Sequence, residues 1–274
     1  MYKKAYVLLI FLFTPFLTTQ ALATHHTNGP ENQRNVTVPS FRTAFNFADT
    51  MSFAAKNYDC DVYGKNNVCF TVGVRGTMIE NSHTSKHNST FLLGKKISDQ
   101  FRIALFYDIN HDYYNSRYIV VSNRKPMMGG FLVWNQKDNQ TYIKLSHSFQ
   151  EQDLEINTPR TTWLLKRTGN TSIAANNTNA EIGILYRQGS LNVTPYGVLA
   201  YNTKTIDSYT QTGDDGAAFL HTYNEISNKT FALTAGVKFK KEFTQSINLL
   251  SDIAVRHNIQ NQIDTITATW QHHT

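Results

Sequence analysis

The residues in this chain that could carry chemistry are two cysteines and a few clusters of histidine and aspartate. Cys60 and Cys69 are separated by eight residues. In an exported protein this pair is expected to form a structural disulfide, closing a small loop before the first clear strand. A redox role is the alternative, but the spacing matches neither a CxxC motif nor a cysteine–histidine metal site.

The other candidate clusters give weak signals. His25-His26 and His272-His273 are adjacent pairs near the two ends, and adjacent histidines rarely serve one metal site. The segment Gly213-Asp214-Asp215-Gly216 lacks the remaining positions of an EF-hand calcium loop. The G-x-S-x-G motif of a hydrolase is missing as well. The sequence therefore predicts no enzyme activity, no metal site and no cofactor.

The N-terminus has the features of a secretory signal peptide. Two lysines near the start are followed by an apolar run over 5–13 and by the small-residue motif Ala21-Leu22-Ala23. We expect residues 1–23 to be removed by cleavage after Ala23. A membrane anchor is the weaker alternative, because the apolar run is short and Pro15 interrupts it.

Composition narrows the class of protein further. Lys and Arg number 26 against 20 Asp and Glu, and this modest excess is spread along the chain, so it does not indicate nucleic-acid binding. The hydrophobic content of 41% suits a soluble sheet, and it also suits a barrel with a polar lumen. No later segment reaches the roughly 18 apolar residues that a membrane helix requires. Any insertion into a membrane must therefore be by strands.

Apolar and polar residues alternate with a period of two along much of the chain, as in strands with one apolar and one polar face. In one segment Phe231, Leu233 and Val237 alternate with polar residues that include Lys238. We predict an all-β fold, and the pattern fits either a soluble sheet with one solvated face or a transmembrane β-barrel with lipid outside and water inside. The predicted strands cover 70–78, 91–97, 101–110, 130–135, 142–148, 180–187, 191–202, 231–241, 247–257 and 264–270.

The region before the strands divides into a leader and a helix. Residues 24–40 are polar and are expected to form a flexible leader. Ser40 is expected to cap a short helix over 41–56, in which Phe41 and Phe45 fall on one face. The helix either covers a core or lies at or in the mouth of a barrel, and the sequence favours neither. The β-domain then occupies 57–274.

The links between predicted strands alternate in length, which is typical of outer-membrane barrels. Short links are expected at 97–101, 187–191 and 241–247, and long polar links at 80–89, 111–126, 149–179 and 203–230. A further long link is expected at 258–263. Charged residues on the polar faces are expected to point into the lumen, because on a lipid face each would cost a few kcal/mol. These residues are Arg75, Arg102, Asp108, Lys144, Glu181, Arg187, Lys238, Asp252 and Arg256.

Several segments resemble, in the same order, the β-domain of bacterial autotransporters. Val72-Gly73-Val74-Arg75-Gly76 resembles the opening strand of that domain, and 91–96 with 101–107 resembles its next hairpin. The closest match is 180–187 followed by 191–201, where Pro195-Tyr196 lies inside a strand. The order continues with the loop 207–228 and the segment 234–239.

The resemblance implies an outer-membrane barrel of twelve strands with a helix through its pore, in a Gram-negative bacterium. Together with the ten strands predicted above, it leads us to expect an antiparallel transmembrane β-barrel of about 10 to 12 strands with a short N-terminal helix. Such a barrel would anchor or export a short N-terminal segment, and would contact outer-membrane lipid, barrel-assembly machinery and periplasmic chaperones. Relative to the family, the chain is expected to be short at its C-terminus and to carry almost no passenger. We expect a monomer with no nucleic-acid partner. The alternatives are a surface adhesin or structural barrel without export, and a soluble secreted β-sandwich that binds a ligand.

Overall fold

A computed structural model describes residues 38–48, 58–60, 63–79, 84–110, 118–121, 125–137, 140–158, 166–213, 216–242 and 248–272. The expected signal peptide and most of the expected leader lie outside these ranges, and so does the part of the expected helix after residue 48. Within the described ranges, no helix combines the length and the hydropathy that crossing a membrane requires.

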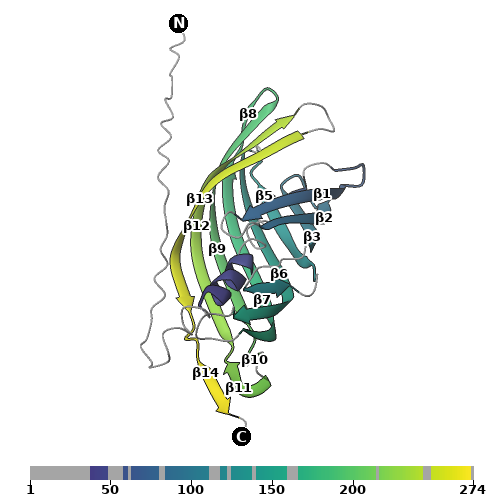
Figure 1. Cartoon of the computed structure of the whole chain (residues 1–274). Coiled ribbons are helices and arrows are strands. Elements are labelled where there is room, and N and C mark those ends of the chain that lie inside the picture. The colour runs from purple at the N-terminus through teal and green to yellow at the C-terminus, as the bar shows by residue number, and fades with distance from the viewer. Residues whose placement is uncertain are drawn as a thin grey trace.

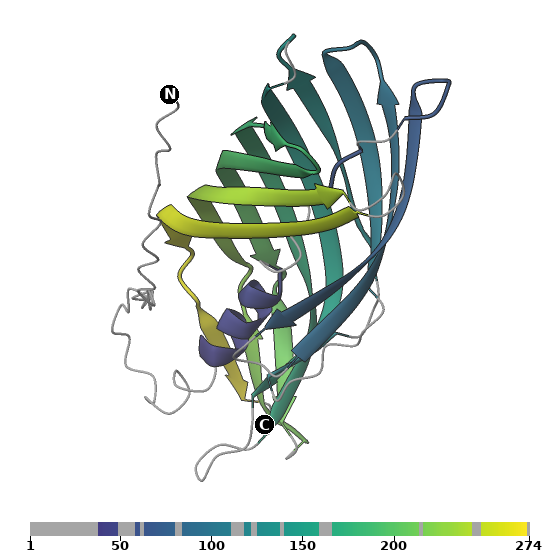
Figure 2. The same ribbon diagram turned by 90° about the horizontal axis from the view of Figure 1, so that it is seen from above.

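Fourteen strands form one sheet in the described part of the chain, and the pairings between them are antiparallel. Figure 1 and Figure 2 show this sheet as a curved wall around the helix of residues 38–48. The strands are β1 (Val68–Ile79), β2 (Thr84–Lys96), β3 (Phe101–Asn110), β4 (Ile119–Val121), β5 (Met127–Asn135), β6 (Thr141–Thr158), β7 (Arg167–Ile184), β8 (Tyr186–Gln188), β9 (Leu191–Ile206), β10 (Tyr209–Gly213), β11 (Gly216–Tyr223), β12 (Ile226–Glu242), β13 (Asn248–Ile263) and β14 (Ala268–His272).

The main wall runs in the order β1-β2-β3-β5-β6-β7-β9-β12-β13. Its longest pairing joins β6 to β7 from Thr141↔Ile184 to Thr158↔Arg167. β8 follows β7 in the chain, and both strands pair with β9. The remaining strands lengthen the sheet at one end, where β4 pairs with β6, β10 with β7, β11 with β10, and β14 with β11.

The two rims of the wall differ in their links. The links 97–100, 136–140, 189–190 and 243–247 all lie at one rim, which we call the short-turn rim. The tight turn predicted at Gly189-Ser190 is present, and Gly189 adopts a φ of 61° there, which favours glycine. The links at the opposite, long-loop rim are mostly longer and include β4 and the β10–β11 hairpin. The unequal link lengths at the two rims agree with the prediction in part. The long link expected at 80–89 is wrong, because β2 already begins at Thr84, and the one expected at 258–263 is wrong, because β13 continues to Ile263.

The outer face of the wall carries an apolar belt. Leu105 on β3 is 70% exposed and Ile182 on β7 is 54% exposed, and their strand neighbours face inward, where Glu181 is only 3% exposed. Alternation with the apolar residues outward and the polar residues inward is the pattern of a strand between lipid and an aqueous lumen. The belt therefore has the pattern that the membrane-crossing part of a β-barrel would show.

Beyond the belt, towards the long-loop rim, the alternation changes phase. On β6 the outward residues Leu145 and Phe149 are exposed and apolar, whereas further along the strand it is the inward residues Leu154 and Ile156 that are apolar and buried. An apolar side that turns inward is the pattern of a sheet whose outer face is in water. We call this part of the sheet, with β4, β10, β11 and β14, the extension. Buried apolar residues also face inward on the other long strands that enter the extension. They are Ile173 on β7, Ile206 on β9 and Ile226 on β12.

The extension corrects two expectations. Residues 149–179 were expected to form a long polar link, but β6 continues to Thr158 and β7 begins at Arg167. Residues 203–230 were expected to form another, but they include β10 and β11. The expected strand number was low because the change of phase and the polar outward residues hide these strands from a search for alternation.

β1 and β13 form the two edges of the main wall. Among the described residues, β1 pairs with β2 alone and β13 pairs with β12 alone, so the wall is not closed there. Both strands begin at the short-turn rim, since Val68 lies opposite Lys95 and Asn248 lies opposite Glu242. Both then run towards the long-loop rim.

Candidate functional site in the barrel interior

The helix lies inside the curve of the wall at the level of the extension. Val38, Pro39 and Ser40 are already helical, so the helix begins earlier than the expected start at Phe41. Ser40 lies within the helix and not at its cap: its hydroxyl donates a hydrogen bond to the carbonyl oxygen of Asn157 at 3.0 Å. Proline is well tolerated in the first turn of a helix, because its missing N–H would have no partner there.

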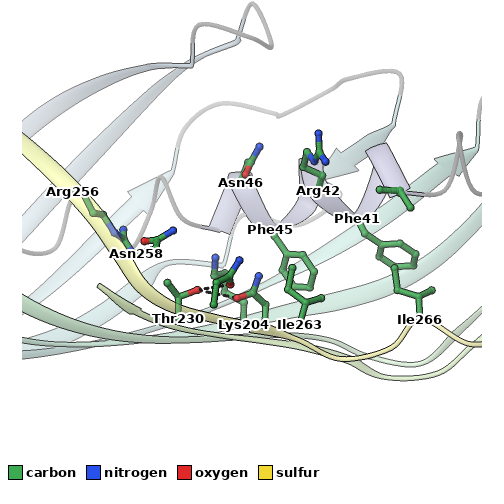
Figure 3. A pocket seen from close by; sticks show the side chains of 13 residues that line it. Phe41, Arg42, Phe45, Asn46, Lys204, Thr230, Arg256, Asn258, Ile263 and Ile266 are labelled. Atoms are coloured by element: carbon green, nitrogen blue, oxygen red, sulfur yellow. Dashed lines mark hydrogen bonds between the residues drawn. The ribbon is translucent and has the colours of Figure 1, made fainter. Parts of the chain in front are cut away.

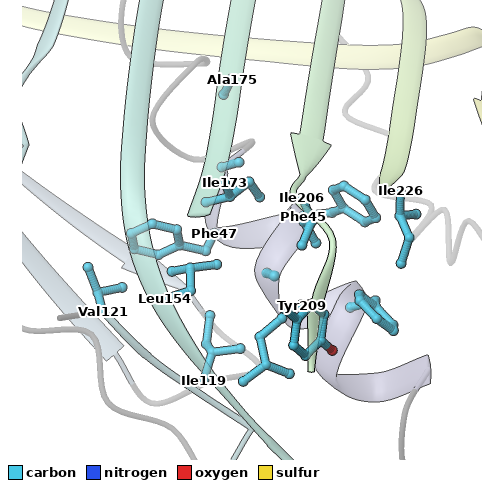
Figure 4. Packing of buried hydrophobic residues seen from close by; sticks show 14 of the residues in the cluster. Phe45, Phe47, Ile119, Val121, Leu154, Ile173, Ala175, Ile206, Tyr209 and Ile226 are labelled. Atoms are coloured by element: carbon cyan, nitrogen blue, oxygen red, sulfur yellow. The ribbon is translucent and has the colours of Figure 1, made fainter. Parts of the chain in front are cut away.

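An apolar cluster fixes the helix to the extension (Figure 4). Phe41 makes edge-to-face contacts with the rings of Tyr209 and Tyr223, at centroid distances of 6.2 and 5.7 Å. Phe45 and Phe47 lie against Ile173, Ile206 and their neighbours on the inner face of the wall. The helix therefore covers a core and also lies in the barrel mouth, which were the two alternatives left open by the sequence.

A cluster of charged groups fills the interior near the short-turn rim, around residues 58–60. A disulfide joins Cys60 to Cys69 of β1 and holds this segment to the wall. The Asp59 carboxylate forms an ion pair with Arg102 at 3.0 Å, and the buried Lys144 ammonium donates to the carbonyl oxygen of Tyr58. The segment is thus held to β1, β3 and β6 at once.

The same cluster continues across the lumen to the last strands of the wall. The Lys238 ammonium lies 2.5 Å from a Glu181 carboxylate oxygen, and the Tyr142 hydroxyl donates to the same oxygen at 2.5 Å. Lys238 also lies 4.5 Å from the ring centre of Tyr196, whose hydroxyl donates to Asp252 at 2.7 Å. Buried charges are costly unless they are paired, and here both signs are present.

The structure gathers most of the predicted lumen-facing charges. Asp108 joins the cluster as acceptor for the side chains of Tyr58 and Asn88. Arg187 is exposed near the short-turn rim, Arg256 lines a separate cavity beside the helix, and the side chain of Arg75 is not described. The gathered residues are Arg102, Asp108, Lys144, Glu181, Lys238 and Asp252.

Sequence reasoning missed the partners that complete the cluster: Tyr58, Asp59, Tyr142 and Tyr196. Asp59 could have been found from its position next to Cys60. A disulfide from Cys60 to the first strand places the neighbouring residue beside the inner face of the wall. Within the described ranges, no group of three or more His, Cys, Asp or Glu side chains could hold a metal ion. Asp214, Asp215, His25, His26 and His273 lie outside those ranges.

Two titratable groups on the extension, outside the belt, have shifted pKa values. The carboxylates of Glu151 and Asp153 lie 2.5 and 2.9 Å from the Lys125 ammonium, and these hydrogen bonds raise the pKa of Lys125. Burial, and then the charge of Arg167, lower the pKa of His221 to about 4. The Arg167 guanidinium donates to Nε2 of His221, a contact that requires the neutral imidazole.

Comparison with known proteins assigns the fold. The family model of the autotransporter beta-domain matches residues 83–273. The chain belongs to the autotransporter β-domain family. The solved structure of the translocator domain of autotransporter NalP from Neisseria meningitidis is similar, with a TM-score of 0.63 and 15% sequence identity over 86% of this chain and 84% of that chain. At that identity the likeness shows the fold alone. No curated protein matches the chain.

As an autotransporter β-domain, the chain is an outer-membrane β-barrel protein of translocator type. The family resemblance and the antiparallel barrel-type fold predicted from the sequence are confirmed. The match begins at residue 83, so the helix, the 58–60 segment and β1 precede it. These elements are nevertheless packed against strands inside the matched region.

Proposed function

We propose that this β-domain anchors its own N-terminal segment and displays it outside the cell, at the long-loop rim. The observation that carries the proposal is the path of the chain through the interior. Phe41 packs on Tyr209 and Tyr223 of the extension, whereas Tyr58 and Asp59 lie in the charge cluster near the opposite rim. The helix therefore lies towards the long-loop rim, and residues 58–60 lie near the short-turn rim, before β1 begins.

The polarity of the rims gives this path a direction in the cell. Outer-membrane barrels have short periplasmic turns and longer extracellular loops. The residues that precede the helix, which correspond to the expected leader, then emerge on the outside. The charge cluster at the periplasmic end and the helix at the outer end would both hold the chain in the lumen, so that the segment remains attached after export.

An epitope inserted after Thr24 tests the display. On intact cells an antibody should label this variant, because the epitope lies outside. The matched control carries the same epitope between Gly189 and Ser190, in a tight turn at the opposite rim, and should be labelled only after the outer membrane is permeabilised. Labelling of both variants, or of the control alone, on intact cells would contradict the proposed orientation. Heat-modifiable gel mobility confirms that both variants fold.

We also infer how the chain reaches the membrane. The signal peptide over 1–23 would direct export, and periplasmic chaperones and barrel-assembly machinery would insert the strands. N-terminal sequencing of the purified protein should begin at Thr24. Depletion of the assembly machinery should remove the chain from the outer-membrane fraction, whereas unchanged insertion after depletion would contradict the inferred dependence.

A further inference from the structure

A second interior site lies beside the helix, away from the charge cluster. It is a cavity of about 250 Å³ between the helix and strands β9, β12 and β13 (Figure 3). Its lining residues are all among the described ones. The display of an N-terminal segment makes no use of this cavity.

The charge of the lining has one sign. Arg42, Lys204 and Arg256 contribute three basic side chains, and no acidic side chain is among the described residues that line the cavity. Lys204 is only 2% exposed, and its ammonium lies 5.9 Å from the ring centre of Phe45. The Nε of Arg256 is buried and has no hydrogen-bond partner among the described residues. Such an orphaned guanidinium donor is costly unless a ligand or a water accepts from it.

The neutral polar groups add donors to the site. Thr230 lies between Asn228 and Asn261, and its hydroxyl oxygen is 2.9 and 3.2 Å from their Oδ1 atoms. The hydroxyl has a single hydrogen, and its shorter contact is the one to Asn228. Donation to Asn228 Oδ1 leaves the –NH₂ group of Asn228 to meet a ligand. A cavity with basic groups and amide side chains, and with no carboxylate among its described lining residues, suits an anion.

One end of the cavity is apolar. Phe41 and Phe45 of the helix face it, together with Ile263 and Ile266 from the other side. An inorganic anion alone would leave this end unfilled. A volume of about 250 Å³ is below the usual range for drug-sized ligands, so the occupant should be small.

We propose that this cavity binds a phosphate monoester, with the phosphate at Arg256 and Lys204 and a short apolar group against Phe41 and Phe45. Phosphate is favoured over carboxylate because the several positive charges match a dianion and the forked guanidinium of arginine binds phosphate oxygens in pairs. The ester could be a soluble molecule or the headgroup of an amphiphile. The two sources share this chemistry.

Phenyl phosphate is the probe for the soluble source. Titrated into the refolded full chain in a neutral maltoside detergent, it should bind saturably by calorimetry. Benzyl alcohol, which has the ring without the charge, should bind much more weakly. Equal binding of the two probes would overturn the proposal, because it would show an apolar cavity with no anion site. Dodecyl phosphate mixed into the micelles tests the amphiphile source. Binding of neither phosphate would also overturn the proposal.

Three variants locate the bound anion. Arg256→Gln should weaken binding about tenfold or more, as expected for loss of a charged hydrogen-bond donor. Asn258→Asp, at an exposed position of the lining, should weaken it similarly by supplying the site with its own carboxylate. The matched control is Lys229→Gln, which removes one positive charge from the opposite, exposed face of β12 and should bind like the wild type. Equal loss in the control and in Arg256→Gln would show nonspecific attraction and refute the site. Circular dichroism and heat-modifiability verify that each variant folds.

Discussion

Replacing Ile182 with arginine tests whether the belt faces lipid. Ile182 lies on β7, points outward and is 54% exposed. The matched control is Asn170→Arg, on the same strand and the same face but within the extension, where it is also exposed. Both variants add the same side chain to the outer surface of one strand. They differ in the height at which the charge is placed.

The magnitude follows from the height of the belt on this strand. The outward positions from Thr178 to Tyr186 span about eight steps of roughly 3.3 Å, or about 26 Å along the chain. A strand tilt of about 40° reduces this to about 20 Å of height, within an apolar band of about 25 Å. Ile182 is the middle position. Arginine there should lower the free energy of unfolding by about 2 to 4 kcal/mol, whereas near or beyond the interface the loss is about 0 to 1 kcal/mol.

The assay is guanidinium unfolding of the full chain refolded into phospholipid vesicles, followed by tryptophan fluorescence. Both variants should keep the wild-type denaturant slope, and the Ile182→Arg curve alone should shift to lower denaturant. The belt assignment fails if Asn170→Arg loses as much free energy as Ile182→Arg, or if both lose less than about 1 kcal/mol. Repeating the measurement with mature chains expressed without residues 1–23 removes any effect of signal-peptide cleavage.

Three further predictions concern the interior and the extension. Phe41→Ala should destabilise the helix packing by about 3 to 5 kcal/mol, since it leaves a cavity between Tyr209 and Tyr223; faster trypsin cleavage after the exposed Arg42 should report it, and an unchanged rate would contradict the packing. The double replacement of Cys60 and Cys69 by serine should cost about 2 to 3 kcal/mol for a loop this short, measured by unfolding with and without reductant; only the wild type should respond to the reductant. Because the pKa of His221 is lowered from 6.5 to about 4, the unfolded chain binds more protons between these values, and stability should fall as the pH drops through that window. His221→Gln should flatten this part of the stability profile, and an identical slope in both proteins would refute the assignment.

The sequence predicted the strands of the belt because lipid and lumen impose opposite preferences on neighbouring residues. Nine of the ten predicted strands lie mainly within strands of the sheet, including β3 over the same residues as predicted. The tenth, predicted over 264–270, was largely wrong, because β14 begins only at Ala268. Alternation failed where both faces of a strand become partly polar. In β7, Asn170, Ser172 and Asn176 face outward, and a polar run of this kind looks like a loop when pairing partners are unknown.

The interior was only partly predictable for a different reason. The strand faces gave the side on which Lys144, Glu181 and Lys238 lie, since that depends on local periodicity. Their partners depend on long-range register: Lys144 and Glu181 are cross-strand neighbours in the β6–β7 pairing, but Asp59 comes from a segment outside the sheet. The cavity beside the helix joins the helix to strands more than 150 residues away in sequence, so no local pattern could indicate it.

The chain direction of the two edge strands limits which strands can pair with them. β1 and β13 both run from the short-turn rim to the long-loop rim, so they could pair with each other only in parallel, unlike the other pairs of the sheet. A second copy inserted in the same orientation would offer two more edges of the same direction. Unpaired backbone groups at membrane depth cost several kcal/mol each. A strand that pairs antiparallel with either edge must run from the long-loop rim to the short-turn rim. Closing the wall by antiparallel pairing alone therefore requires an odd number of additional strands between β13 and β1.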